Sequence, residues 1–196
     1  MKPVVSRQLP GLAALLLLGA CGGARGEFGT DGERGGDPTN SSNSASSESR
    51  GAAPLVDPDT LITLRRSECF GVCPAYSLSV SGEGTVSYVG TSYVKVQGVA
   101  SSQVSVSQVQ ELVNEMWDAG YFDMVEPSPC NSSITDAPSV ITSLRLGPQT
   151  HRVEHYRGNP CSPRSLTTIE DRIDEVTGSD RWLRCDTPTG YCPPSY

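Results

Sequence analysis

The sequence predicts one α+β domain, in which two helices pack on one face of a mostly antiparallel sheet. Two observations lead to this class. Several segments show the two-residue period of half-buried strands, and two others show the three-to-four-residue period of amphipathic helices. The resulting order, ββββαββα, lacks the regular strand–helix alternation of a parallel sheet.

Four strands are predicted before the first helix. Residues 61–66 (LITLRR) form the first strand. The second strand, residues 75–81, alternates large apolar side chains with serines, so we expect one face of this strand to be buried and the other to be exposed to solvent. A glycine-containing turn at residues 81–84 leads to a third strand that begins near Val86. Residues 93–99 are the expected fourth strand.

The first helix follows these strands. Ser105 and Gln108 have the spacing of a capping box, and Gly120 is placed to end the helix. The residues expected on its buried face are Val109, Leu112, Val113 and Met116. A second hairpin then joins residues 140–146 to residues 150–156 across a Gly-Pro-Gln turn.

The last helix is expected to begin with Ser162 as its N-cap and Pro163 in its first position, and to end at Gly178. Its expected buried residues are Leu166, Ile169, Ile173 and Val176. Its acidic residues are expected to form a solvated face: Glu170, Asp171, Asp174 and Glu175. Trp182 and Leu183 are expected to dock after the helix.

The first 20 residues have the pattern of a lipoprotein signal peptide. Lys2 and Arg7 precede an apolar run at residues 11–20. Such a run rises only about 15 Å as a helix, half of the roughly 30 Å of bilayer hydrocarbon, so it is too short to span a membrane. The sequence L-G-A-C, which ends at Cys21, resembles a bacterial lipobox, in which cleavage precedes the cysteine and its sulfur carries the lipid.

We therefore expect a bacterial cell-envelope protein that contacts the membrane through a lipid on Cys21. Gly22, rather than an aspartate, follows this cysteine, which in Gram-negative lipoproteins implies passage to the outer membrane. The alternative is an ordinary signal peptide, in which the cysteine occurs by chance and carries no lipid.

The rest of the chain divides into three parts. Residues 21–54 combine the lipidated cysteine with a Gly- and Ser-rich tether that cannot bury enough surface to offset chain entropy. Residues 55–185 have the usual size of one domain. Residues 186–196 are expected to be a C-terminal coil. The net charge of −7 argues against nucleic-acid binding, because it has the wrong sign for neutralising phosphates.

Six cysteines remain once Cys21 is assigned to the lipid, which favours three disulfides in an exported chain. Sequence alone leaves their connectivity open. Local spacing suggests the pairs Cys69–Cys73, Cys185–Cys192 and, for the remaining two, Cys130–Cys161. A sharper alternative makes Cys69 and Cys73 a redox pair or a clip for copper or zinc. Against it, the spacing differs from C-x-x-C, and no histidine or lysine neighbours the pair in the sequence.

The two histidines are weak candidates for chemistry. His151 and His155 share one face of a predicted strand at about 13 Å, too far apart to bind one metal ion. A hydrogen bond between His155 and Asp136 would be a first ingredient of acid–base catalysis, although such a pair is more often a satisfied polar contact. No metal site and no cofactor is predicted, and the common hydrolase, zinc and nucleotide-binding motifs are missing.

Four stretches resemble an uncharacterised bacterial family, the domain of unknown function six-four-three-eight. They are residues 65–88, 108–123, 135–147 and 153–158. The most specific element is C-F-G-x-C-P-x-Y, which begins at Cys69, and the resemblance extends over about residues 61–182. It implies a small exported or lipid-anchored domain, and it carries no catalytic residues over to this chain.

These observations favour a non-enzymatic envelope protein, whose disulfide-stapled domain is a binding or structural module for another envelope protein. The alternative function is that of a thiol-redox or metal-handling protein that uses Cys69 and Cys73.

Overall fold

The computed structural model describes residues 51–190 and 192, which belong to one compact unit, Ser47–Tyr196. The predicted signal peptide, Cys21, most of the predicted tether and the end of the predicted C-terminal coil lie outside the described residues. Within the described part of the chain, none of the helices combines the length and the hydropathy needed to cross a bilayer.

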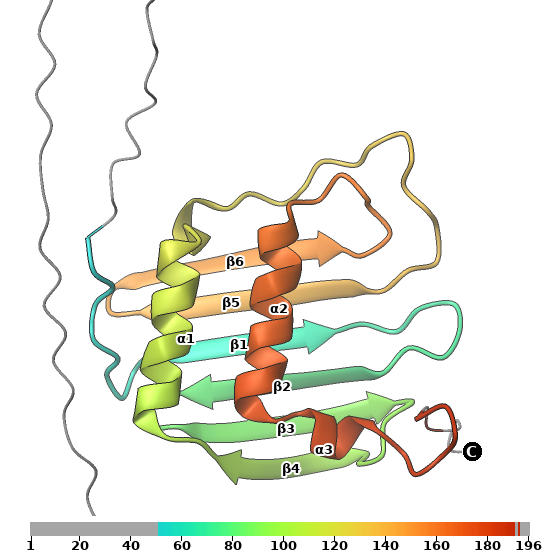
Figure 1. Cartoon of the computed structure of the whole chain (residues 1–196), viewed down its shortest axis with the longest axis horizontal. Coiled ribbons are helices and arrows are strands. Elements are labelled where there is room, and N and C mark those ends of the chain that lie inside the picture. The colour runs from blue at the N-terminus through green and yellow to red at the C-terminus, as the bar shows by residue number, and fades with distance from the viewer. Residues whose placement is uncertain (1–50, 191, 193–196) are drawn as a thin grey trace, which may run out of the picture. The chain divides into compact units, whose positions relative to one another are not determined.

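Six antiparallel strands form a single sheet in the order β4-β3-β2-β1-β5-β6 (Figure 1). The strands are β1 (Leu61–Arg66), β2 (Ala75–Ser81), β3 (Thr85–Ser92), β4 (Gly98–Gln103), β5 (Ser139–Leu146) and β6 (Gln149–Tyr156). The first strand in the sequence lies inside the sheet, between β2 and β5. The two edges of the sheet are β4 and β6.

Two helices, α1 (Val106–Asp118) and α2 (Arg164–Thr177), run across one face of this sheet (Figure 1). The short helices η1 (Tyr121–Asp123) and α3 (Asp180–Leu183) follow them. The α+β class, the antiparallel sheet and the order ββββαββα are therefore confirmed.

The two-residue period of the strands places the core between sheet and helices. Alternate side chains of β1, β2 and β3 are fully or almost fully buried: Ile62, Leu64, Leu78, Val80, Val86 and Tyr88. They pack against the apolar stripes of α1 and α2, which include Leu112, Met116, Leu166 and Ile173. The opposite face of the sheet carries small hydroxyl side chains, among them Thr63, Ser79, Ser87, Ser101 and Ser143.

The helix ends follow the sequence signals in α1 but not at the start of α2. Ser105 and Gln108 form the predicted capping box, and Gly120 has a positive φ of 74° after α1. Ser162, however, does not cap α2, because its backbone N–H donates to the Asn159 carbonyl in the preceding turn. Its hydroxyl is buried without a partner among the described residues, and Pro163 takes the N-cap position.

The fourth strand lies later than predicted, at Gly98–Gln103 instead of residues 93–99. Tyr93 adopts a positive φ of 55°, which takes the chain out of an extended conformation. The backbone N–H of Val96 then donates to the Trp182 carbonyl at 2.9 Å. These residues therefore form a loop that contacts the C-terminal segment, and Trp182 docks as expected.

The chain enters the domain along α1. The indole N–H of Trp117 donates to the Gly51 carbonyl at 2.6 Å, and the Gln110 side chain donates to the Pro54 carbonyl at 3.2 Å. The last residues of the predicted tether therefore contact this helix. They lie at the end of the sheet opposite the β1–β2 loop (Figure 1).

Candidate functional site

Three disulfides staple loops at one end of the sheet, the end at which β1 and β6 finish. The pairs are Cys69–Cys73, Cys130–Cys161 and Cys185–Cys192, with Cα separations of 5.7, 6.2 and 5.1 Å. These are the pairs that local spacing suggests. We call this end of the sheet the disulfide end.

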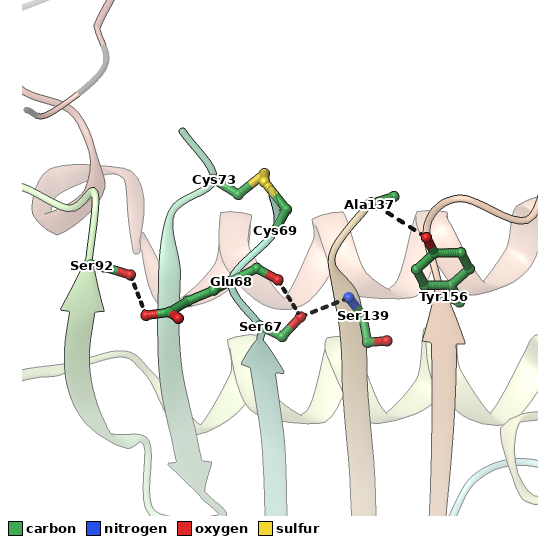
Figure 2. The surroundings of a disulfide bond; sticks show 8 residues. All are labelled: Ser67, Glu68, Cys69, Cys73, Ser92, Ala137, Ser139 and Tyr156. Carbon is green, nitrogen blue, oxygen red and sulfur yellow. Dashed lines mark hydrogen bonds between the residues drawn. A yellow bond between two sulfur atoms is a disulfide. The ribbon is translucent and has the colours of Figure 1, made fainter. Parts of the chain in front are cut away.

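The shortest of these rings closes the β1–β2 connection, residues 67–74, which we call the disulfide loop. Figure 2 shows the Cys69–Cys73 bond beyond the ends of the neighbouring strands. The two cysteines are half-buried, whereas the Phe70 side chain between them is 89% exposed. Val72 is exposed as well. The loop therefore presents apolar side chains to solvent.

Hydrogen bonds tie the base of the disulfide loop to strands on both sides (Figure 2). The hydroxyl of Ser67 accepts from the Ser139 N–H at 2.8 Å and donates to the Glu68 carbonyl at 2.9 Å. The Glu68 carboxylate accepts from the Ser92 hydroxyl at 2.8 Å. These contacts fix the loop to β5 and β3.

A second loop, residues 124–138, joins η1 to β5, and only its last residues, 134–138, lie beside the disulfide loop. The Phe70 N–H donates to the Asp136 carbonyl at 3.1 Å, which joins the two loops directly. The Tyr156 hydroxyl donates to the Ile134 carbonyl at 2.9 Å and accepts from the Ala137 N–H at 3.1 Å. Ile134 is 65% exposed, so the second loop also presents a fixed apolar side chain.

Several hollows border the disulfide loop. One, of about 390 Å³, is lined by Glu68, Cys69, Phe70, Gly71, Thr91, Ser92, Tyr93 and Gln97. Another, of about 330 Å³, includes Pro74 together with Gly190 of the C-terminal segment. The disulfide end is therefore an uneven surface from which apolar side chains project.

The alternative thiol chemistry would use the Cys69–Cys73 pair. The two sulfurs are joined to each other. In the part of the chain that the structure describes, no basic side chain forms a hydrogen bond or ion pair with either one. Nor do residues 51–190 and 192 contain a group of three or more His, Cys, Asp and Glu side chains that could hold a metal ion.

The structure does not bring His155 and Asp136 together as a pair. His155 is buried under α2, where its Nδ1 atom lies 2.6 Å from Oε1 of Glu170. Asp136 lies in the exposed second loop, with a positive φ of 69°. The other histidine, His151, places its Nε2 atom 2.8 Å from the Met124 carbonyl. Both histidines therefore have structural partners.

The prediction that the four acidic residues of α2 form a solvated face is wrong for two of them. The Glu170 side chain is 2% exposed and that of Asp174 is 19% exposed. Glu170 bonds His155 and also accepts from Arg157 at 2.7 Å. Its position, four residues after Leu166, places it within the buried stripe of the helix, where the positive charges of Arg66 and Arg157 compensate its burial.

Asp174 ties α2 to the first two strands. Its carboxylate accepts from the Arg66 guanidinium at 2.7 Å, from the Tyr76 hydroxyl at 2.6 Å and from the Ser179 hydroxyl at 2.6 Å. Burial raises the pKa of Tyr76 well above its usual value, and the Asp174 charge raises it further. Tyr76 therefore stays protonated as a hydrogen-bond donor.

This buried cluster lies between the helix and the sheet, and it holds them together. Its groups satisfy one another: Arg66, Tyr76, His155, Arg157, Glu170 and Asp174. The exposed side chains of Phe70, Val72 and Ile134 lie instead at the disulfide end. The fold and the site thus define a disulfide-stapled α+β domain that presents an apolar loop.

The family model described as Domain of unknown function (DUF6438) matches residues 60–177, which is more than half of the chain. The chain belongs to this family. The match begins just before β1 and ends with α2, so it includes the disulfide loop and the buried cluster. No curated protein matches the chain.

Proposed function

We propose that this chain is a lipid-anchored protein of the bacterial cell envelope, and that its domain binds another envelope protein through the disulfide loop. The observation that carries the proposal is the exposure of Phe70, which is 89% exposed although its backbone is fixed by the Cys69–Cys73 ring and by Asp136.

The energetics favour Phe70 as an anchor for a partner. Burying such a side chain contributes roughly 1.5–3 kcal/mol. A loop that is already closed and hydrogen-bonded loses less conformational entropy on binding than a free segment does. Aromatic side chains near the centre of an interface often supply a large share of the affinity.

The fold does not account for the type of residue at position 70. Within the C-F-G-x-C-P-x-Y segment, Cys69 and Cys73 form the disulfide. Tyr76 is buried against Arg66 and Asp174. Phe70 packs into no core, so a contact outside the domain gives its aromatic side chain a role.

The envelope location is supported by the L-G-A-C sequence at Cys21 and by the three disulfides, which persist in oxidising compartments. Mass spectrometry of the native protein tests it. We expect a chain that begins at a lipid-modified Cys21, and a Cys21→Ala variant that leaves the membrane fraction. An unmodified chain that begins at Met1 in the cytosol would overturn this part of the proposal.

Photo-cross-linking in cells tests the binding role. A photoreactive amino acid replaces Phe70 in the full chain, and a matched chain carries it at Val125, which is also an exposed apolar residue. We expect one defined envelope protein to be cross-linked from position 70 but not from position 125. Equal or absent cross-linking at the two positions contradicts the proposal.

The affinity for the captured protein then supplies a quantitative test. Phe70→Ala is expected to weaken binding by about 10- to 100-fold, because it removes a buried aromatic contact. Val125→Ala serves as the control and is expected to change the affinity less than about twofold. An unchanged affinity of the Phe70→Ala protein would place the interface elsewhere.

A further inference from the structure

The two edges of the sheet differ in how they are protected. An edge strand exposes unpaired backbone groups, and proteins usually guard such edges with charges, prolines, bulges or a covering segment. β6 carries Arg152 and Glu154, which form an ion pair with each other. The second loop also reaches β6, because Glu126 pairs with Arg152 and the Met124 carbonyl contacts His151.

Among residues 51–190 and 192, nothing gives β4 any of these protections. Its sequence is GVASSQ, and no charged residue or proline occurs between Lys95 and Glu111. Its register with β3 is continuous over all six residue pairs, without a bulge. The side chain of Val99 is 82% exposed on the open face of the sheet. β4 is therefore an uncharged edge without a bulge.

The ladder with β3 shows which backbone groups of β4 remain open. The Val104 N–H donates to the Gly84 carbonyl at 2.9 Å, just beyond the end of the strand. Because hydrogen-bonded positions alternate along an antiparallel pair, Ser102 and Ala100 also bond to β3. The N–H and C=O groups of Val99, Ser101 and Gln103 therefore point away from the sheet.

We propose that two copies of this chain associate through β4, in an antiparallel pairing with its two-fold axis at Ser101. In this register Ser101 of one copy lies opposite Ser101 of the other, and Val99 lies opposite Gln103. The outward-facing N–H and C=O groups at all three positions of each strand then form hydrogen bonds with the other copy. The two sheets become one continuous sheet.

A second copy supplies an identical unguarded edge, which a two-fold axis can pair with this one. The chain carries a net charge of −7, so most contacts between copies bring acidic surfaces together. The uncharged stretch that contains β4 avoids this repulsion. The strand is also complementary to itself, because its small outward-facing centre, Ser101, meets an identical small residue. This inference does not depend on the proposed function.

Cysteine cross-linking of the full chain tests the register. Residues in a hydrogen-bonded antiparallel pair have Cα atoms about 5.5 Å apart, within the roughly 4.4–6.8 Å that a disulfide spans. Ser101→Cys is therefore expected to give a covalent dimer under mild oxidation. Ser87→Cys is the matched control, because Ser87 lies on the same face beside Ser101 but on the interior strand β3.

The outcomes are clear in either direction. A dimer of the Ser101→Cys protein on a non-reducing gel, several-fold above that of the Ser87→Cys protein, supports the pairing. Equal amounts of dimer in the two variants, or a bond from position 101 to a different protein, overturns it.

A second variant tests the backbone contact without an added thiol. Ser101→Pro removes an N–H group that β3 does not use, so the fold is expected to persist. Sedimentation of the full chain in detergent is expected to show a dimer for the unmodified protein and a monomer for this variant. A monomeric unmodified protein at all concentrations tested would overturn the proposal.

Discussion

The Nδ1 atom of His155 lies 2.6 Å from Oε1 of Glu170, and both side chains are almost completely buried. The other carboxylate oxygen of Glu170 accepts from Arg157 at 2.7 Å. A single acidic side chain of α2 therefore holds two residues at the end of β6 and its following turn. Such a contact fixes the position of the helix on the sheet.

Removing the Glu170 carboxylate is expected to destabilise the fold strongly. Glu170→Ala leaves the buried Nδ1 atom of His155 without its partner and removes the carboxylate that pairs with Arg66 and Arg157. Leaving a buried polar group unsatisfied costs about 1–3 kcal/mol, and more when a charged group is involved. Urea unfolding of the disulfide-bonded protein, followed by circular dichroism, measures the free energy of unfolding. The control is Asp171→Ala on the same helix, where the side chain is 63% exposed. It is expected to cost less than about 1 kcal/mol, and equal losses in the two variants would show that Glu170 has no special role.

Two buried tyrosines are expected to respond in opposite directions to the loss of their hydroxyl groups. Tyr88 Oη is buried and has no hydrogen-bond partner among the described residues, so Tyr88→Phe is expected to stabilise the fold by about 1 kcal/mol. Tyr121 donates to the Thr142 hydroxyl at 2.9 Å, so Tyr121→Phe is expected to cost about 1–2 kcal/mol. Thermal unfolding of the two variants measures the difference, and a loss of stability in Tyr88→Phe would contradict the prediction.

Stability is expected to fall in alkaline solution. Burial raises the pKa of Tyr88 and of Tyr121 to about 12, and it raises that of Tyr76 as well. The unfolded chain releases these protons near pH 10, whereas the folded chain retains them. Their contribution is therefore complete below about pH 10 and is lost as the pH rises toward 12, at about 1.4 kcal/mol per pH unit for each group.

Urea unfolding at pH 8, 10 and 11, together with tyrosinate absorbance, checks this prediction. The free energy of unfolding should be nearly constant between pH 8 and about pH 9.5 and should then decline. Tyr76→Phe should reduce the slope. A free energy of unfolding that is the same at pH 8 and pH 11 would be incompatible with three protonated, buried tyrosines.

The three disulfides are expected to contribute unequally. Cys130–Cys161 closes a sequence separation of 31 residues, whereas Cys69–Cys73 closes one of 4. In the loop-entropy description, replacing both cysteines of a pair by alanine lowers the free energy of unfolding. The loss is about 4 kcal/mol for Cys130–Cys161 and about 2 kcal/mol for Cys69–Cys73. Urea unfolding under non-reducing conditions measures both losses. A larger loss for the short ring would show that the disulfide loop supports the fold directly.

The sequence predicted the elements whose local pattern agrees with their final environment. The residues 75–81 strand alternates apolar and serine side chains, and the structure places it at Ala75–Ser81. The fourth strand was displaced because the exposed edge leaves only a weak pattern in GVASSQ, whereas Val94 and Val96 pack on the core within a loop. A tertiary contact with the C-terminal segment determined this difference.

The buried acidic residues illustrate a different limit. Charge alone places Glu170 in solvent, because an unpaired buried carboxylate is costly. Its partners are Arg66, His155 and Arg157, which lie in other parts of the sequence. One signal was available, since Leu166, Glu170, Ile173 and Thr177 follow helical spacing along one stripe. The exposure of Phe70 could not be foreseen in this way, because it depends on how two loops meet.

The path of the chain along α1 has a practical consequence. Gly51 accepts a hydrogen bond from Trp117 of α1. The segment that enters the domain lies at the end of the sheet remote from the β1–β2 connection (Figure 1). A fusion partner, an affinity handle or a fatty acyl group added upstream of residue 51 is therefore joined to the domain away from Phe70. Immobilising the protein by its N-terminus should leave the aromatic ring free to meet soluble molecules, which makes a sensor surface prepared in this way suited to ligand screening.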